Sequence, residues 1–333
     1  MLRLTDKSLT PAAAQVTAQA GVLASFADAS ERTLRTMCGL RISESTVERT
    51  TEEAGMRVAE QLAQGHTAGP ACSWTWQRDA AGRTCAYIGV DHTGVRQQGP
   101  EGSRAEGKMA GVGIVYNPRS DYDAQRPPAR QVRYLSGFYE LDELGRQLRR
   151  EAEAVGIMDA DVQLALSDGG SGLEDLLKGF FPRCVCILDF WHAKEHLVEL
   201  AQALYATDDE ARKKWLDEWC HRLKHEGGPT VLAALRAMDL NGCSEQVREC
   251  HRKQVTYFRN HAHRMDYPTY VANGWQIGSG PVESACKTVV GNRLKGGGMR
   301  WGEAGADAVC HLRAVYLSEP GCWNQLWAVG QAS

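Results

Sequence analysis

The chain has 333 residues, of which 43% are hydrophobic and 24% are charged. This length and composition predict roughly two globular domains and exclude a disordered, collagen-like or coiled-coil protein. The formal net charge of −3 gives no general support for nucleic-acid binding, so DNA contacts would have to come from locally concentrated cations.

The sequence contains no run of about 18 apolar residues and no convincing signal peptide. We therefore expect a cytoplasmic protein that makes no membrane contact. The cysteines are odd in number, 11 in all, and contain no C-x-x-C pair. This pattern favours reduced thiols over a zinc or disulfide framework.

Residues 1–80 have the pattern of helices. Two of them, ending near Cys38 and beginning at Ser43, surround a tight turn at Gly39, and Ser43 is a good N-cap residue. This arrangement resembles a helix-turn-helix. However, the second helix carries several glutamates, which phosphate would repel, so a packing pair of helices is an equally good interpretation.

The pattern then changes from helices to strands. We expect strands at 84–91, 110–117 and 132–140, a helix at 141–157, a strand at 161–168 and a short helix. A further apolar run at 184–192 predicts another strand, which leads directly into a helix. This order predicts an α/β fold with a mixed sheet covered by helices. Residues 201–272 lose all strand character and predict a helical insertion, after which helices are expected at 281–295 and roughly 303–317.

Three carboxylates occupy positions that suit catalysis. We expect Asp91 to close the first strand, Asp168 to close the fourth strand and Glu283 to start a late helix. Ligands of open α/β sheets collect beyond the carboxyl ends of strands, and converging acids need a cation to neutralise them. Oxygen ligands without cysteine or paired histidine favour Mg²⁺ or Mn²⁺, and two such ions serve phosphodiester chemistry.

Each of these residues also has a structural interpretation. Asp91 and Asp168 are good turn formers, and Glu283 could complement a helix N-terminus with Lys287 as its i,i+4 partner. Asp189 could cap the following helix, and His192 could be an ordinary histidine at the edge of the core. Trp275 could belong to the core or stack on an unpaired base.

Four sequence blocks resemble one known family. GWQIGSGPVESACKTVVGNRLKGGGMRW (274–301) is similar to the C-terminal block of ISKra-type bacterial insertion-sequence transposases, which belong to the RNase H-like DDE superfamily. SDGGSGL (167–173) and LDFWHAKEHL (188–197) resemble the central blocks of that family, and YIGVDHTGV (87–95) resembles the block of the first acid.

The resemblance implies an RNase H-like mixed sheet flanked by helices, with an all-helical insertion before the last catalytic helix. The corresponding parts are a helix-turn-helix-like segment at 1–80, the first part of the core at 81–200, the insertion at 201–272 and the C-terminal core helices at 273–333. Relatives carry a longer N-terminal DNA-binding region, so this copy is expected to be truncated.

The resemblance also implies roles for individual residues. Asp91, Asp168 and Glu283 would be the catalytic ligands of two Mg²⁺ or Mn²⁺ ions, and Asp189 and His192 would form a supporting motif. The DNA-binding residues that it implies lie in and near an acid-free stretch: Trp275, Lys287, Arg293, Lys295 and Arg300.

The function expected on this basis is DNA cleavage and strand transfer at insertion-sequence ends. The partners would be double-stranded DNA, as element ends and target, and further copies of the chain on that DNA, at the nucleoid. Family members usually have glycine where His92 follows Asp91, and this departure motivates the alternative of an inactive derivative that binds DNA or a partner. A two-carboxylate glycosidase is a third possibility, but a neutral sugar has no need for the basic stretch after Glu283.

Overall fold

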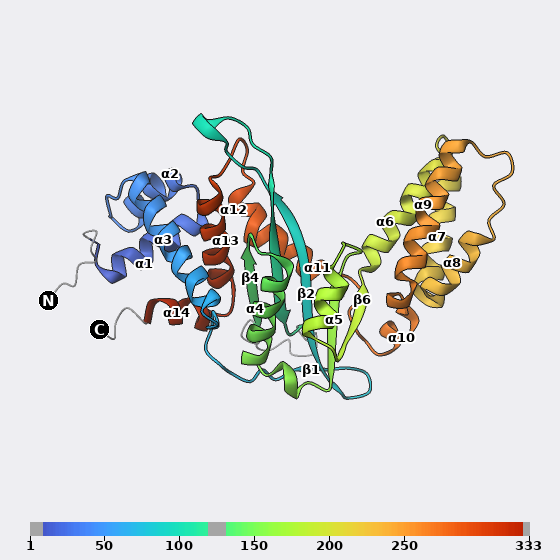
Figure 1. The fold of residues 1–333 in the computed structure, drawn as a ribbon, viewed down its shortest axis with the longest axis horizontal. Coiled ribbons are helices and arrows are strands. Elements are labelled where there is room, and N and C mark those ends of the chain that lie inside the picture. Colours follow the sequence, from blue (N-terminus) through green and yellow to red (C-terminus); the bar gives the residue numbers. More distant parts are fainter. Residues whose placement is uncertain (1–8, 119–130, 329–333) are drawn as a thin grey trace. The chain divides into compact units, whose positions relative to one another are not determined.

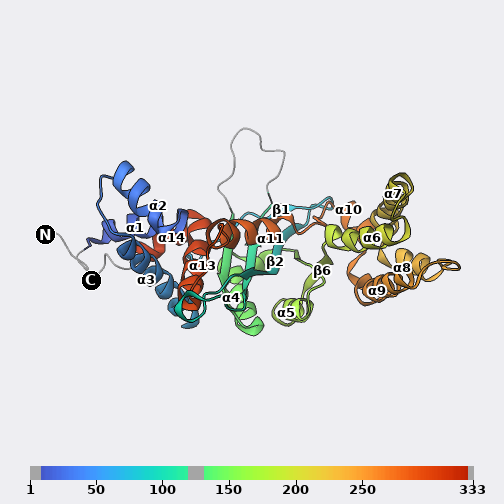
Figure 2. The same ribbon diagram turned by 90° about the horizontal axis from the view of Figure 1, so that it is seen from above.

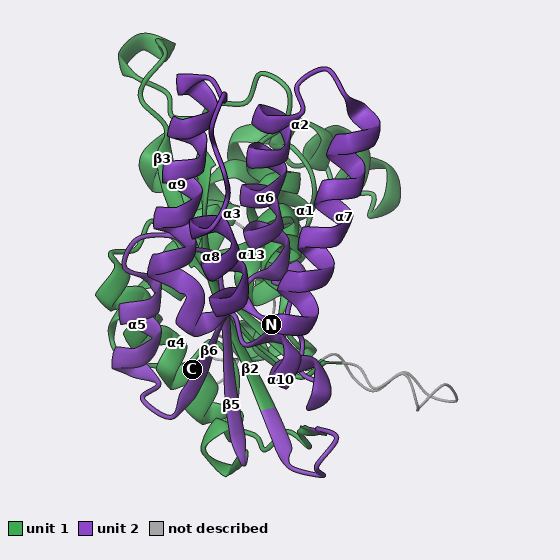
Figure 3. Ribbon diagram, turned by 90° about the vertical axis from the view of Figure 1, so that its right-hand side faces the viewer, with its two compact units in different colours: residues 1–77, 86–160, 281–333 green, residues 78–85, 161–280 purple. Residues whose placement is uncertain are grey.

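A computed structural model describes residues 9–118 and 131–328 (Figure 1). The chain divides into two compact units, each assembled from separate stretches of sequence (Figure 3). Unit 1 contains residues 1–77, 86–160 and 281–333, and unit 2 contains residues 78–85 and 161–280. The fold is α/β, with a mixed sheet whose unit 1 strands are antiparallel and whose unit 2 strands are parallel. The predicted class, a mixed sheet flanked by helices, is confirmed.

Unit 1 contributes helices from both ends of the chain and three of the long strands. Its elements are α1 (Pro11–Leu23), α2 (Phe26–Asp28), the π-helix η1 (Ala29–Met37), α3 (Glu44–Ala63), β2 (Thr84–Val95, whose first two residues belong to unit 2), η2 (Pro100–Gly102), β3 (Lys108–Tyr116), β4 (Val132–Gly137), α4 (Leu141–Ala154), η3 (Ile157–Asp159), α11 (Gly280–Ala285), the π-helix η5 (Cys286–Gly291), α12 (Asn292–Leu294), α13 (Glu303–Leu317) and α14 (Pro320–Ala328).

Unit 2 contains the parallel strand pair and a group of helices. Its elements are β1 (Gln77–Arg78, at the unit boundary), β5 (Val162–Ser167), α5 (Leu173–Phe180), β6 (Cys184–Leu188), α6 (Phe190–Leu204), α7 (Asp209–Glu226), α8 (Gly228–Arg236), α9 (Glu245–His261), η4 (Ala262–Arg264) and α10 (Tyr267–Ala272). Helices α6 to α9 pack on one another, and residues 201–272 contain no strand in this described part of the chain.

Helices cover both faces of the antiparallel strands of unit 1, as Figure 2 shows from above. On one face, Leu144 and Leu148 of α4 pack against two glycines of β3, Gly111 and Gly113. On the other face, α11 approaches β2 so closely that a Cβ on Gly89 would lie 2.1 Å from Cγ2 of Val282. Only a residue without a side chain permits this approach, which fixes the helix that carries Glu283 against β2.

The N-terminal helices form the turn predicted between residues 38 and 43. The hydroxyl of Ser43 accepts a hydrogen bond from the amide of Thr46 at 3.3 Å, so Ser43 is the N-cap of α3 as expected. Buried Leu34 and Val47 join the two helices through a small apolar cluster. Helix α3 in turn packs along α13, which ties the N-terminal helices to the C-terminal part of unit 1.

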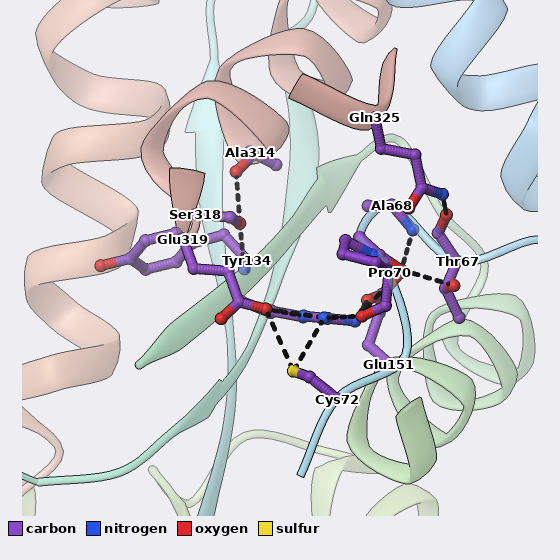
Figure 4. A network of polar contacts seen from close by, with 12 residues as sticks. Thr67, Ala68, Pro70, Cys72, Tyr134, Glu151, Ala314, Ser318, Glu319 and Gln325 are labelled. Carbon is purple, nitrogen blue, oxygen red and sulfur yellow. Dashed lines mark hydrogen bonds and ion pairs between the residues drawn. The ribbon is translucent and has the colours of Figure 1, made fainter. Parts of the chain in front are cut away.

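A buried ion network joins four segments of unit 1 (Figure 4). Arg133 of β4, 1% exposed, forms ion pairs with Glu151 of α4 at 3.1 Å and with Glu319, between α13 and α14, at 2.6 Å. It also donates hydrogen bonds to the carbonyls of Gly69 and Pro70 in the loop after α3. A buried charge is tolerated only when it is paired in this way.

No helix in the described ranges is both long enough and apolar enough to cross a membrane. All 11 cysteines are free thiols.

Candidate functional site

One face of β2 collects the first group of predicted site residues. Gly89, Asp91 and Thr93 alternate along the strand and therefore point to the same side of the sheet. Each meets the segment from α11 to the end of α12: Gly89 packs on Val282, the Sγ of Cys286 donates to Asp91 Oδ2 at 3.4 Å, and the Nζ of Lys295 donates to the Thr93 hydroxyl at 2.5 Å. Cys286 follows Glu283 by one helical turn, so the helical segment that carries Glu283 lies against the Asp91 face of β2 within unit 1.

The position of Asp91 differs from the sequence prediction. Asp91 does not close its strand, because β2 continues to Val95 and pairs with β3, with Asp91 opposite Val112. The predicted end at residue 91 is wrong because the backbone of β3 extends to Lys108 and offers ladder partners to the polar residues that follow Asp91. The half-buried carboxylate accepts a hydrogen bond from the His92 amide at 2.6 Å.

His92 does not crowd the carboxylate of Asp91. Neighbouring side chains on a strand point to opposite faces, and the His92 ring lies on the α4 side, where its Nε2 would be 3.6 Å from a Cβ on Gly111. The imidazole of His92 and the carboxylate of Asp91 therefore lie on opposite faces of β2.

Glu283 lies exposed in the first turn of α11, as predicted. The helix then widens into the π-helix η5 from Cys286, and short π-helical segments are common at functional sites. Arg313 of α13 stabilises this irregular turn by donating hydrogen bonds to the carbonyls of Thr288 and Val289. It also donates to the carbonyl of Val22 at the end of α1. Burial lowers the pKa of Arg313 to about 10.

The second group of predicted residues lies at the carboxyl ends of the parallel strands in unit 2. Ser167 pairs with Leu188, so Asp168 and Asp189 follow neighbouring strand ends in the same register. Asp168 follows its strand as predicted, and its Oδ1 accepts a hydrogen bond from the Gly170 amide at 2.8 Å. This local bond is the turn-forming arrangement that was the structural alternative for Asp168.

Asp189 is buried and fixed by three hydrogen bonds. Its carboxylate accepts from the amide of Trp191 at 3.1 Å, from the amide of Ser279 at 3.0 Å and from the Ser279 hydroxyl at 2.8 Å. Asp189 is therefore the N-cap of α6, and it also anchors the segment before Glu283. The His192 ring lies half-buried, 5.4 Å from the His196 ring.

Three of the four predicted cations are exposed, whereas Arg293 is buried. Lys287, Lys295 and Arg300 present their side chains to solvent. Arg293 is only 2% exposed, lies 4.5 Å from the ring centre of Phe26 and 4.8 Å from that of Trp301, and donates to the Gly21 carbonyl at 2.9 Å. Its assignment to phosphate is wrong, because the guanidinium is packed between aromatic rings, where burial lowers its pKa to about 10.

Trp275 is held within unit 2 by three neighbours. Its Nε1 donates to Asp79 at 3.2 Å, its ring stacks on Tyr270 at a centroid distance of 5.9 Å, and the guanidinium of Arg83 lies 5.5 Å from the ring centre. These contacts agree with the packing interpretation of Trp275. Its stacking on an unpaired base stays a prediction.

The predicted acids have the right donor chemistry for a hard cation. Asp91 and Glu283 are carboxylates of unit 1, and Asp168 is a carboxylate at a strand end of unit 2. Carboxylate oxygens suit Mg²⁺ or Mn²⁺. Within residues 9–118 and 131–328, however, no group of three or more His, Cys, Asp and Glu side chains is placed to hold a metal ion.

Sequence reasoning missed several residues that build these sites. Cys286 and Thr93 could have been predicted from the sequence, because Cys286 follows Glu283 by one helical turn and Thr93 follows Asp91 by the two-residue period of a strand. Arg264, which is 1% exposed and donates to the hydroxyl of Ser167 at 2.6 Å, carries no local sequence pattern. Its role depends on a tertiary contact between segments almost 100 residues apart.

The chain was also compared with known proteins. No family model and no curated protein sequence matches it.

Proposed function

We propose that the chain is a metal-dependent DNA transposase of the RNase H-like DDE type, of the ISKra kind that its sequence blocks resemble. In this proposal, Asp91, Asp168 and Glu283 are the catalytic carboxylates. The reactions are hydrolysis of a phosphodiester at the element end and attack of the freed 3′-hydroxyl on target DNA.

The observation that best supports the proposal is the face of β2 in unit 1. Gly89, Asp91 and Thr93 of this face meet the segment from α11 to Lys295, which carries Glu283, at the three contacts described above. Asp91 and the segment that carries Glu283 are almost 200 residues apart in the sequence, and Lys295 of that segment contacts the same strand as Asp91, at Thr93. A phosphodiester is negatively charged, so its binding requires cations such as Lys295. Its cleavage requires an activated attacking oxygen, and carboxylates such as Asp91 and Glu283 can hold the metal ions that activate it.

The residues of the chain have separate roles in this function. Bound Mg²⁺ or Mn²⁺ would activate the attacking oxygen and neutralise charge on the leaving oxygen. Asp91, Asp168 and Glu283 would hold the ions, while exposed Lys287, Lys295 and Arg300 would bind and orient the DNA backbone. Asp189 would fix the start of α6 and the segment at Ser279 and thereby support the site.

A cleavage and joining assay tests the proposal. The substrates are labelled duplexes made from the DNA on either side of the coding sequence, incubated with the full chain and Mg²⁺ or Mn²⁺. We expect strand cleavage and strand transfer by the wild type and their loss in Asp91→Asn, Asp168→Asn and Glu283→Gln. Glu44→Gln is the matched control, because Glu44 is likewise an exposed glutamate in the first turn of a helix.

Cleavage that survives in any of the three carboxylate variants would contradict the proposal. A mobility-shift assay on the same duplexes separates the alternative function from the proposed one. A wild type that retains DNA but cleaves none of it in either metal ion would identify a binding protein without catalysis.

A further inference from the structure

The turn that carries Asp168 is held by the end of α9 and the adjoining turn η4, all within unit 2. Arg264 of η4 donates to the Ser167 hydroxyl at 2.6 Å and to the Asp168 carbonyl at 3.4 Å. Glu174, just beyond the turn, accepts from His263 at 2.7 Å. Residues on both sides of Asp168 are thus fixed by a helix from the predicted insertion.

The ring of Tyr257 packs against the same turn at Gly169. A Cβ on Gly169 would lie 2.9 Å from Cε2 of Tyr257, 3.2 Å from its hydroxyl oxygen and 3.3 Å from Nε2 of His261. An aromatic ring cannot bend away as a flexible chain can. The backbone beside Asp168 therefore rests directly on the Tyr257 ring.

The Tyr257 ring also contacts the histidines of α6, including His192 of the supporting motif. Tyr257 stacks on His196 with a centroid distance of 3.5 Å and lies 6.1 Å from His192. The Nδ1 of His196 is 2.7 Å from Oε1 of Gln254, which fixes the imidazole. Tyr257 thus packs between the histidines of α6 and the Asp168 turn.

The contact made by Tyr257 is one of packing. Its hydroxyl oxygen is buried and has no hydrogen-bond partner among the described residues, and the same holds for Nδ1 of His261. Removal of the Tyr257 hydroxyl should therefore leave the conformation of the turn unchanged, whereas removal of the whole ring should make the turn more mobile.

We propose that Tyr257 is a positioning residue for Asp168, with its ring acting as a rigid support for the turn at Gly169. This inference rests on the proposed function, in which Asp168 is a metal ligand. It gives the helical insertion a role in organising the catalytic turn, and it explains why Gly169 has no side chain.

The test measures the turn directly and the metal separately, on the full chain. Hydrogen exchange followed by mass spectrometry reports on the amides of residues 167–173, and calorimetry measures the affinity for Mn²⁺ alone. The variants are Tyr257→Ala, Tyr257→Phe, Gly169→Ala and the double variant of Gly169→Ala with Tyr257→Ala. Gly179→Ala is the control, because a Cβ at Gly179 of α5 would meet nothing within 4 Å.

We expect Tyr257→Ala and Gly169→Ala each to raise exchange in the turn about tenfold and to weaken Mn²⁺ binding by a similar factor, as coupled neighbours do. Tyr257→Phe and Gly179→Ala should behave as the wild type. The double variant should show nearly the same exchange rate and Mn²⁺ affinity as Tyr257→Ala alone, because the ring with which the methyl group introduced by Gly169→Ala would clash has been removed.

Two results would overturn the positioning role. One is amide exchange in Tyr257→Ala that stays at the wild-type rate. The other is a Gly169→Ala substitution that raises exchange by the same factor in the wild type and in Tyr257→Ala. A wild type that binds no Mn²⁺ would instead contradict the proposed function. The exchange measurement would in that case still decide whether Tyr257 holds the turn, so the two failures can be told apart.

Discussion

Buried arginines in unit 1 act as structural donors. Arg293 and Arg313 form no ion pair with an acid in the described segments, and each donates to backbone carbonyls at the end of α1. Carbonyls at a helix C-terminus lack partners within the helix, so a guanidinium with several donors suits them. The two arginines thereby join α1 to α12 and α13.

Replacement of Arg293 should therefore affect stability. We expect Arg293→Ala to lower the free energy of unfolding by about 2–4 kcal/mol. The substitution removes the hydrogen-bond donor of the Gly21 carbonyl and creates a cavity between two aromatic rings. Exposed Lys287→Ala should change it by less than about 0.5 kcal/mol. Urea unfolding of both variants checks the difference, and equal stabilities would contradict a structural role for Arg293.

At the scale of elements, the start of β5 is tied to the start of β2 by a reciprocal contact within unit 2. The carboxylate of Asp161 accepts from the amide of Thr84 at 2.7 Å and from its hydroxyl at 2.8 Å, and the Thr84 hydroxyl accepts from the Asp161 amide at 2.9 Å. The hydrogen bonds from Thr84 hold the pKa of Asp161 below its ordinary value of 3.8.

This lowered pKa predicts the pH dependence of a variant. A carboxylate whose pKa is lower in the folded state stabilises the fold fully above its ordinary pKa, and this stabilisation is lost as the pH falls through the folded value. We expect wild type to be more stable than Asp161→Asn at pH 6 and the difference to shrink progressively as the pH falls below 3.8. Urea unfolding across this range checks it, and a difference that is constant with pH would contradict the assignment.

The sequence predicted the elements better than their ends. Alternation and turn residues identified strands β2 to β6, although the short β1 was missed, and the helix expected near 303–317 coincides with α13. The end of β2 was placed four residues early, because the polar His92 and the glycine at Gly94 interrupt the apolar strand pattern and are held in the strand by pairing with β3. Such pairing partners cannot be read from the strand itself.

Some features of the candidate site follow from the local sequence, whereas others depend on tertiary contacts. The positions of Asp168 after a strand and Glu283 in a first helical turn follow from local pattern. The burial of Arg293 could not be predicted, because its neighbours Phe26 and Trp301 come from distant segments. The support of the Asp168 turn by Tyr257 and Arg264 is likewise a property of the fold alone.

At the scale of the whole molecule, the ion network around Arg133 should dominate the stability of unit 1. It joins the loop after α3, strand β4, helix α4 and the α13–α14 junction. We expect Arg133→Met to lower the free energy of unfolding by about 3–5 kcal/mol, because Glu151 would remain buried without its partner. Arg146→Met, which removes more exposed ion pairs of α4, should cost less than about 1 kcal/mol. Thermal or urea unfolding distinguishes the two, and similar losses would contradict the central role of Arg133.

The central claim is that Asp91, Asp168 and Glu283 bind divalent cations, and calorimetric titration of the full chain with Mn²⁺ tests it most directly. The wild type is compared with Asp91→Asn, Asp168→Asn and Glu283→Gln, and with Glu44→Gln as the exposed first-turn control. We predict binding by the wild type and the control, and at least about a tenfold loss of affinity in each carboxylate variant. Equal Mn²⁺ affinity in all five proteins, or no binding by the wild type, would contradict the account.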